Sequence, residues 1–150
     1  MRISTKGRYA LEAVVDLHLH SGNIHESMKN ICERQKLSEN YLEQIFMSLK
    51  RQGIVGSVRG ATGGYYLARE ARLITAWDVI SAVEGDLSLV DCLSVEGKGR
   101  QCSRASCCVT RNVWEKVTET IRSTLESTTV ADLALCYKKM QEGLLSQYSI

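Results

Sequence analysis

The chain has 150 residues, of which 44% are hydrophobic and 24% charged. This length and composition are typical of one globular domain, or of a small domain with an appended module, and argue against a largely disordered chain. No apolar run approaches the roughly 18 residues of a membrane span, and the N-terminus lacks a secretory signal. We therefore expect a cytoplasmic protein with reduced thiols and no membrane partner. The net charge of +2 is uneven, because residues 1–72 carry eleven Lys and Arg against seven Asp and Glu; such a basic front half is compatible with nucleic-acid binding.

Three helices are predicted in the first third of the chain. Apolar residues recur at helical spacing over residues 5–20, 28–35 and 39–52. Ser27 and Ser38 stand where the second and third helices begin, and a serine in that position can cap free backbone amides. Only three residues separate these two helices, which is the pattern of a helix-turn-helix.

A change of period follows the third helix. Residues 54–59 are rich in β-branched side chains, residues 60–64 read GATGG, and residues 65–67 are extended again. This pattern predicts a β-hairpin with a glycine-rich tip. The chain has no proline, which favours helices elsewhere. The predicted fold is therefore mainly α with a small β-hairpin, that is, a winged helix-turn-helix.

Three more helices are predicted after the hairpin. Thr75 and Asp78 have the spacing of a capping box, and Gly85 ends the helix that they begin. Residues 110–126 form a long helix with one narrow apolar stripe, which we expect to pair two copies of the chain, and Thr129 begins a last helix. We expect three regions: a winged helix-turn-helix over 1–85, a cysteine-rich loop over 86–109 and a helical dimerisation region over 110–150.

The third helix and the hairpin carry side chains suited to DNA. Asn and Gln can pair with adenine and Glu with cytosine in the major groove, whereas Ser and Tyr hydroxyls and Arg suit phosphates. An arginine beside a glycine-rich tip can enter the minor groove. Any solvated helix face carries similar residues, so an ordinary surface is the alternative. The candidate DNA-binding residues are Ser38, Asn40, Tyr41, Glu43, Gln44, Arg51 and Arg59, of which the first five are expected to be exposed.

Four cysteines, Cys92, Cys102, Cys107 and Cys108, lie within seventeen residues. Thiolates are soft ligands for iron–sulfur clusters, zinc or copper(I). The spacing differs from the paired motifs of zinc ribbons and from thioredoxin-type C-x-x-C. An iron–sulfur cluster, a structural zinc and a metal-free thiol switch remain as readings of the loop. The other two cysteines lie on apolar helix faces and are expected to be core residues.

The sequence resembles the winged-helix regulators of the IscR, NsrR and CymR kind. The resemblance is carried by MRISTKGRYALEA and by LSENYLEQIFMSLKRQGIVGSVRGATGGYYLA, and continues through ISAVEG and the cysteine loop. It implies a homodimer on a palindromic double-stranded DNA operator. It also implies that Glu43 and Arg59 take part in operator recognition.

The same resemblance implies a ligand set for an iron–sulfur cluster. IscR-type proteins use three loop cysteines, the last of which precedes a tryptophan by six residues, as Cys108 precedes Trp114 here. Cys102 and Cys108 then match the second and third ligands, and Cys92 the first. Cys107 is an additional thiol. The resemblance favours a 2Fe–2S over a 4Fe–4S cluster.

The fourth ligand departs from the family pattern. Arg111 stands where IscR-type proteins have a ligand histidine, and Arg8 stands where NsrR-type proteins have a ligand aspartate. Neither arginine can bind iron. Cys107 is the first choice to replace them, and Glu12 is a weaker one.

The function expected from these observations is a cluster-binding transcription regulator, read as a repressor, that controls iron–sulfur biogenesis or sulfur and redox genes. No nucleophile–base pair or phosphate loop is visible, so no enzyme activity is expected. One alternative is a CymR-like repressor of cysteine metabolism that responds to a partner or to thiol oxidation. An alternative of another class is a zinc-stabilised protein-interaction module.

Overall fold

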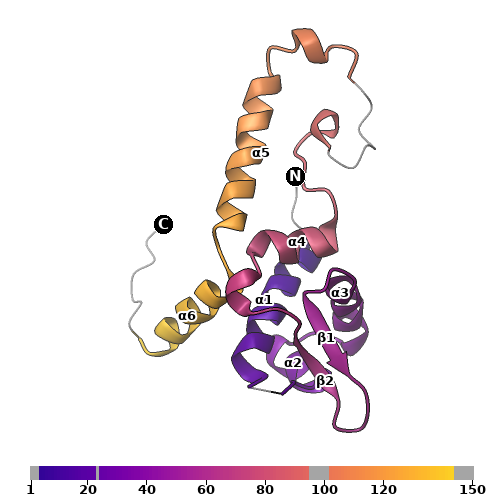
Figure 1. The fold of residues 1–150 in the computed structure, drawn as a ribbon, viewed down its shortest axis with the longest axis vertical. Helices are drawn as coiled ribbons and strands as arrows, with labels where there is room; N and C mark the ends of the chain where they lie inside the picture. The colour runs from indigo at the N-terminus through magenta and orange to yellow at the C-terminus, as the bar shows by residue number, and fades with distance from the viewer. Residues whose placement is uncertain (1–3, 23, 95–101, 144–150) are drawn as a thin grey trace.

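The computed structural model describes residues 4–22, 24–94 and 102–143, and within them the predicted mainly α fold with one β-hairpin is confirmed (Figure 1). Its elements, in chain order, are α1 (Thr5–His20), α2 (Met28–Gln35), α3 (Glu39–Arg51), β1 (Val55–Val58), β2 (Gly64–Leu67), η1 (Ala71–Leu73), α4 (Ala76–Glu84), η2 (Asp91–Leu93), η3 (Ala105–Cys107), α5 (Arg111–Glu126) and α6 (Val130–Gln141).

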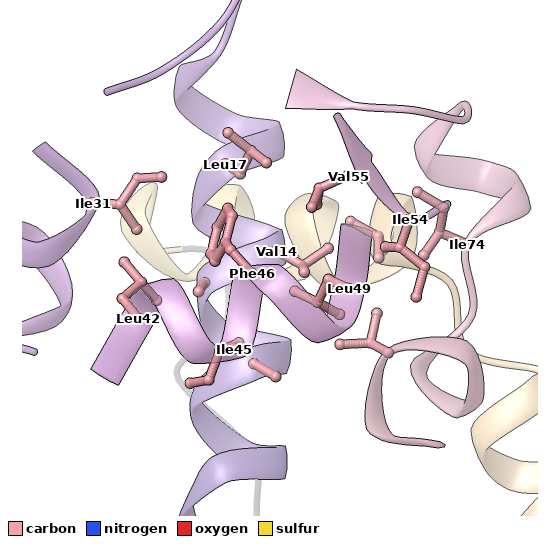
Figure 2. Close-up of a cluster of buried hydrophobic side chains, with 14 of the residues drawn as sticks. Val14, Leu17, Ile31, Leu42, Ile45, Phe46, Leu49, Ile54, Val55 and Ile74 are labelled. Atoms are coloured by element: carbon pink, nitrogen blue, oxygen red, sulfur yellow. The ribbon is translucent and has the colours of Figure 1, made fainter. Parts of the chain in front are cut away.

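The core lies between α1, α3 and the first strand of the hairpin. Figure 2 shows Phe46 of α3 pointing toward Val14 and Leu17 of α1, and all three are fully buried. Because apolar side chains three and four residues apart share one face of a helix, α3 buries one stripe and leaves the opposite face in solvent. Truncating a side chain such as Phe46 to Ala in such a core costs about 3–5 kcal/mol.

Helix starts are fixed by local hydrogen bonds. The Ser27 side chain accepts from the amide of Asn30 at the start of α2. Thr75 and Asp78 form the predicted capping box of α4, with both reciprocal bonds present. Thr129 forms a second complete box at the start of α6. Each box satisfies backbone donors that a helix start leaves unpaired.

The hairpin is extended by one residue from far earlier in the chain. β1 and β2 pair antiparallel, with Gly56 opposite Tyr66. A Cβ on Gly56 would lie 2.3 Å from the Tyr66 ring, so this glycine makes room for the tyrosine. On its other side β2 forms an isolated antiparallel bridge between Tyr65 and Glu26. The hairpin of β1 and β2, called the wing below, therefore has Glu26 as a third, single-residue strand.

The two C-terminal helices differ in how they pack. α6 lies against α1, and Val130 and Ala134 are buried there. Two backbone bonds fix its start, from the Ala76 amide to Thr128 at 2.8 Å and from the Val130 amide to Ile74 at 2.9 Å. By contrast, α5 contains no buried residue and stands out from the other helices (Figure 1). None of the described helices is both long and apolar enough to cross a membrane.

Candidate functional site

The outward face of α3 presents polar side chains to solvent. Asn40, Glu43 and Gln44 are exposed, as predicted. Ser38 occupies the N-cap position of α3, but its hydroxyl makes no capping bond. The Ser38 side chain therefore leaves the backbone amides of the first turn of α3 uncapped.

Tyr41 differs from the expectation, because its side chain is only half-exposed. Its ring meets the edge of Tyr9 on α1, with centroids 6.1 Å apart and planes at 87°. The Arg8 guanidinium lies 4.6 Å from the Tyr9 ring centroid. Tyr41 is less exposed than predicted because α1 supplies an aromatic neighbour that the periodicity of α3 cannot reveal.

Two basic residues lie at the C-terminal end of α3. The Lys50 ammonium donates to the Ser57 hydroxyl at 2.6 Å, which ties the helix to β1. Arg51, a predicted DNA-binding residue, is exposed and lies 3.4 Å from the Met47 sulfur. Both cations remain on the surface beside the wing.

The wing tip carries Arg59 in an exposed, tight turn. Gly60 has φ 118°, which only glycine adopts without strain. A Cβ on Gly63 would lie 2.3 Å from the Val58 carbonyl oxygen, so the chain closes too tightly here for any side chain. The His25 ring binds the Thr62 carbonyl and anchors the tip to the segment before α2.

An ion-pair network around the buried Asp16, next to the hairpin, was missed by sequence reasoning. Asp16 of α1 is 6% exposed and accepts two hydrogen bonds from Arg34 Nε and one, at 2.7 Å, from Arg34 Nη2. Arg34 also contacts Glu26, at 3.2 Å. Burial tends to raise the pKa of Glu26, but hydrogen bonds from Asn30 and Ser27 and the charge of Arg34 outweigh it and lower that pKa. No local period marks such a network, because its members come from α1, from the segment before α2 and from α2.

The loop cysteines are carried by two separate turns. Cys92 lies in η2 and is exposed, Cys107 lies in η3 and is exposed, and Cys102 and Cys108 flank η3 and are half-buried. All four are free thiols. In the part of the chain that the structure describes, no group of three His, Cys, Asp or Glu side chains is close enough to hold a metal ion. The structure thus places Cys102, Cys107 and Cys108 on one short segment, and does not bring the candidate ligands to a common point.

The environment of Cys108 favours its thiolate. A hydrogen bond from the Thr110 side chain, with Sγ and Oγ1 3.4 Å apart, is the main cause that lowers the pKa of Cys108. The Arg111 side chain is paired within α5, where its Nε donates to Glu115 at 2.7 Å. The Cys107 thiol meets the backbone oxygen of Arg104 at 3.6 Å.

The two remaining cysteines have different surroundings. Cys32 is buried, as predicted, and burial together with the charges of Glu39 and Glu43 raises its pKa. Cys136 is half-buried and lines a groove of about 590 Å³ between α1 and α6, so it is not a core residue.

An apolar stripe is left uncovered along α5. Val113 is 55% exposed, Trp114 41% and Val117 40%. Ile121 and Leu125 continue the stripe and are half-buried. Contiguous exposed apolar residues of this kind mark an interaction face.

Comparisons with known proteins agree with this architecture. The model of the Rrf2 family, described as an iron-dependent transcriptional regulator, matches residues 3–135. The chain is 40% identical over 133 residues to the HTH-type transcriptional regulator IscR of Yersinia pseudotuberculosis, covering 89% of this chain and 79% of that protein. It is also 40% identical over 145 residues to the HTH-type transcriptional regulator CymR of Bacillus subtilis, covering 97% and 98%.

Solved structures give the same result. T. potens IscR matches with a TM-score of 0.72 and 41% identity, covering 98% of this chain and 93% of that one. CymR, the global cysteine regulator of B. subtilis, matches with a TM-score of 0.70 and 38% identity, covering 89% and 96%. The predicted likeness to IscR and CymR regulators is confirmed, as is the expectation that the protein is not an enzyme. The chain belongs to the Rrf2 family of winged-helix transcriptional regulators.

Proposed function

We propose that this regulator binds palindromic double-stranded DNA as a homodimer, and that an iron–sulfur cluster on its cysteine loop sets its affinity for the operator. The observation that carries the DNA part is the exposed polar face of α3 beside the exposed Arg59 of the wing. Residues 1–85 would bind DNA, residues 86–109 would hold the cluster and residues 110–150 would form the dimer. The protein would act in the cytoplasm as a repressor of iron–sulfur, sulfur or redox genes.

The proposed DNA contacts follow from side-chain chemistry. Asn40, Glu43 and Gln44 would reach base edges from the first turns of α3, where a recognition helix meets the major groove. Tyr41 would contribute through the part of its side chain that Tyr9 leaves uncovered. Ser38 and Arg51 would bind phosphates at the two ends of the helix, and Arg59 would enter the minor groove.

The homodimer is supported by the uncovered stripe on α5. A single copy of α5 exposes Val113, Trp114 and Val117. A second copy of the same helix offers a matching apolar surface. Two-fold pairing is the commonest way to bury such a self-complementary face. It would also place two recognition helices about one DNA turn apart.

The donor set on the loop fits an iron–sulfur cluster. Cys92, Cys102 and Cys108 would hold it, with Cys107 as the additional donor; all are free thiols. The lowered pKa of Cys108 supports the thiolate that iron requires. When bound, a cluster, 2Fe–2S rather than 4Fe–4S, would supply a redox- and oxygen-sensitive centre. This chain's own part is to present the thiols on a segment between the DNA-binding unit and α5.

A metal-free thiol response is the second candidate. It is favoured by two observations: the described cysteines do not converge, and B. subtilis CymR matches over nearly its whole length. A relative, CymR of Staphylococcus aureus, has been solved in an oxidized form. In this reading the loop cysteines would respond by oxidation rather than by binding a cluster.

Anaerobic purification with iron, sulfide and zinc analysis separates these readings. Visible absorption that is lost in Cys92→Ala, Cys102→Ala and Cys108→Ala, but kept in the control Cys32→Ala, supports the cluster. A colourless protein with stoichiometric zinc supports the zinc module, and a colourless metal-free protein supports the thiol response.

The DNA part is tested separately. Duplexes with about 30 random base pairs, which hold two half-sites one turn apart, are selected on the full-length protein. Arg59→Ala and Glu43→Ala are each expected to weaken binding of the selected duplex by about 1–3 kcal/mol. If no duplex is enriched, or if neither variant binds more weakly, the proposed operator contacts are wrong.

A further inference from the structure

We propose that Glu26, held by Arg34, is a positioning residue for operator binding: it fixes the wing, and with it Arg59, relative to the recognition helix. The inference rests on the proposed function, because it assumes that the wing meets DNA. Glu26 itself lies behind the hairpin and need not touch DNA. A continuous chain of contacts runs from α1 through α2 to β2.

The first contact joins α1 to α2. The Asp16 carboxylate is buried, and Arg34 approaches it with Nε at 2.9 Å and Nη2 at 2.7 Å from its two oxygens. Gln35 adds a bond to the same carboxylate at 3.2 Å. Such a two-pronged pair fixes the plane of the guanidinium as well as its distance. The Arg34 guanidinium is therefore held in one orientation at the surface, although its side chain is 31% exposed.

The second contact joins α2 to the segment before it. Arg34 Nη2 reaches Glu26 Oε2 at 3.2 Å. The other oxygen, Oε1, accepts from the Ser27 amide at 2.8 Å and from the Asn30 side chain at 2.7 Å. The Glu26 side chain is only 11% exposed. Both oxygens of this carboxylate are thus bonded to α2 and its N-cap residue.

The third contact joins that backbone to the wing. The Glu26 and Tyr65 amides each donate to the other residue's carbonyl, both at 2.8 Å. A Cβ on Gly64 would lie 2.4 Å from the backbone oxygen of Glu26, so the two segments are too close to admit a side chain at this position. The Tyr65 ring in turn meets Phe46 of α3 with centroids 4.7 Å apart. The position of Glu26 therefore sets the distance between the wing and α3.

The energetic consequence follows from the size of the wing. Two strands of four residues each are marginally stable without a further partner. If Glu26 is released, the wing samples more orientations, and the apparent dissociation constant rises by the inverse of the competent fraction. We expect about a fivefold weaker complex, entirely through Arg59.

The test is a double-mutant cycle on the full-length protein with the selected random-library duplex. Glu26→Ala should weaken binding about fivefold in the wild-type background and by less than about twofold in the Arg59→Ala background. Glu70→Ala is the matched control, because Glu70 is exposed and paired with Arg72 away from this network. Glu70→Ala removes one negative charge, as Glu26→Ala does, and the loss of a negative charge by itself favours binding to DNA phosphates.

The outcomes distinguish this inference from the function on which it rests. If Arg59→Ala does not weaken binding, the wing contact of the proposed function fails. If Arg59→Ala weakens binding but Glu26→Ala costs the same in both backgrounds, only the positioning role fails. Arg34→Ala is not used, because it strands the buried Asp16 charge at a cost of about 3–5 kcal/mol and can prevent folding.

A readout without DNA tests the same role. Amide hydrogen exchange at Tyr65 reports the opening of the Glu26 bridge, whereas exchange at Leu49 in α3 reports the core. Glu26→Ala should raise exchange at Tyr65 several-fold and leave Leu49 unchanged, and Glu26→Gln, which still accepts from Ser27, should have a smaller effect. Equal acceleration at both amides, or no acceleration at Tyr65, would overturn the proposal.

Discussion

Glu84 accepts a hydrogen bond from the Gly7 amide at 2.8 Å and thereby joins the last residue of α4 to the first turn of α1. The same oxygen accepts from the Ser4 amide at 3.0 Å and from the Ser4 hydroxyl at 2.6 Å. A carboxylate in this place satisfies amides that α1 leaves free and meets the positive end of its dipole. Gly85, which follows at once, starts the segment that leads to the cysteines. The cysteine loop therefore departs from a point that is fixed to the DNA-binding unit.

Removing this carboxylate should destabilise the fold. Glu84→Ala is expected to lower the free energy of unfolding by about 2 kcal/mol, because it leaves several donors without their acceptor. Glu84→Gln keeps an acceptor oxygen and should lose less. Urea unfolding of both variants is compared with Glu70→Ala, whose carboxylate is exposed. Equal stability of Glu84→Ala and Glu70→Ala would show that the bonds contribute nothing.

Most of the fold was predictable because its signals are local. Two helix starts are examples. The capping box of α4 joins Thr75 to Asp78, and the cap of α2 joins Ser27 to Asn30, so each depends on residues three apart and predicts where its helix begins. The glycine-rich tip announces the hairpin in the same way.

The remaining features depend on contacts between distant segments. The Glu26–Tyr65 bridge has no period, and Tyr41 is partly covered by a residue from another helix. The sequence identifies the four cysteines as candidate ligands, but residue spacing cannot predict whether Cys92 on η2 lies close to the cysteines around η3. That question belongs to the tertiary arrangement and to the group that would be bound.

A side chain on Gly64 should break the third strand of the wing. In Gly64→Ala the new Cβ would lie 2.4 Å from the Glu26 oxygen, so the bridge must open. We expect a loss of about 1–3 kcal/mol in unfolding free energy, and faster amide exchange at Tyr65. Ala61→Ser, at an exposed position of the tip, is the control and should change neither quantity. A Gly64→Ala protein that retains slow exchange at Tyr65 would contradict the close approach.

Glu26 should contribute to stability only while it is ionised. Its folded pKa lies below the ordinary value of 4.5, because hydrogen bonds from Asn30 and Ser27 and the charge of Arg34 outweigh its burial. A group of this kind stabilises the fold above its unfolded pKa, and the contribution is lost as the pH falls through the folded value. The stability gap between wild type and Glu26→Gln should thus be constant from about pH 7 to pH 6 and shrink below about pH 4.5. Urea unfolding across this range checks it, and a gap that widens in acid would contradict it.

The apolar stripe of α5 should be required for pairing of two copies. Val117 is 40% exposed in one copy, and an aspartate buried there in a dimer would cost several kcal/mol. Val117→Asp is therefore expected to raise the dimer dissociation constant by about 100-fold or more, measured by sedimentation velocity. Ser123→Asp adds the same charge at an exposed position on the other side of α5 and should leave the dimer intact. A Val117→Asp protein that sediments as a dimer, as Ser123→Asp is expected to do, would exclude the α5 stripe as the interface.

The fourth ligand of the proposed cluster can be tested by moving it. Arg111 pairs with Glu115 at 2.7 Å on the surface of α5, and losing such an exposed pair costs about 1 kcal/mol or less, so Arg111→His should leave the helix folded. If Cys107 is the fourth donor, Cys107→Ala should lose iron and visible absorption.

Imidazole also ligates iron in iron–sulfur centres. Adding Arg111→His to Cys107→Ala should therefore restore a cluster with a shifted spectrum, while Arg111→His alone keeps the wild-type spectrum. Iron and sulfide content with visible circular dichroism, all measured anaerobically, would show this. An unchanged spectrum in Cys107→Ala would show that Cys107 is not a ligand. The next candidate would then be a carboxylate of α1, first Glu12, whose side chain is about half-exposed and lies near Arg8.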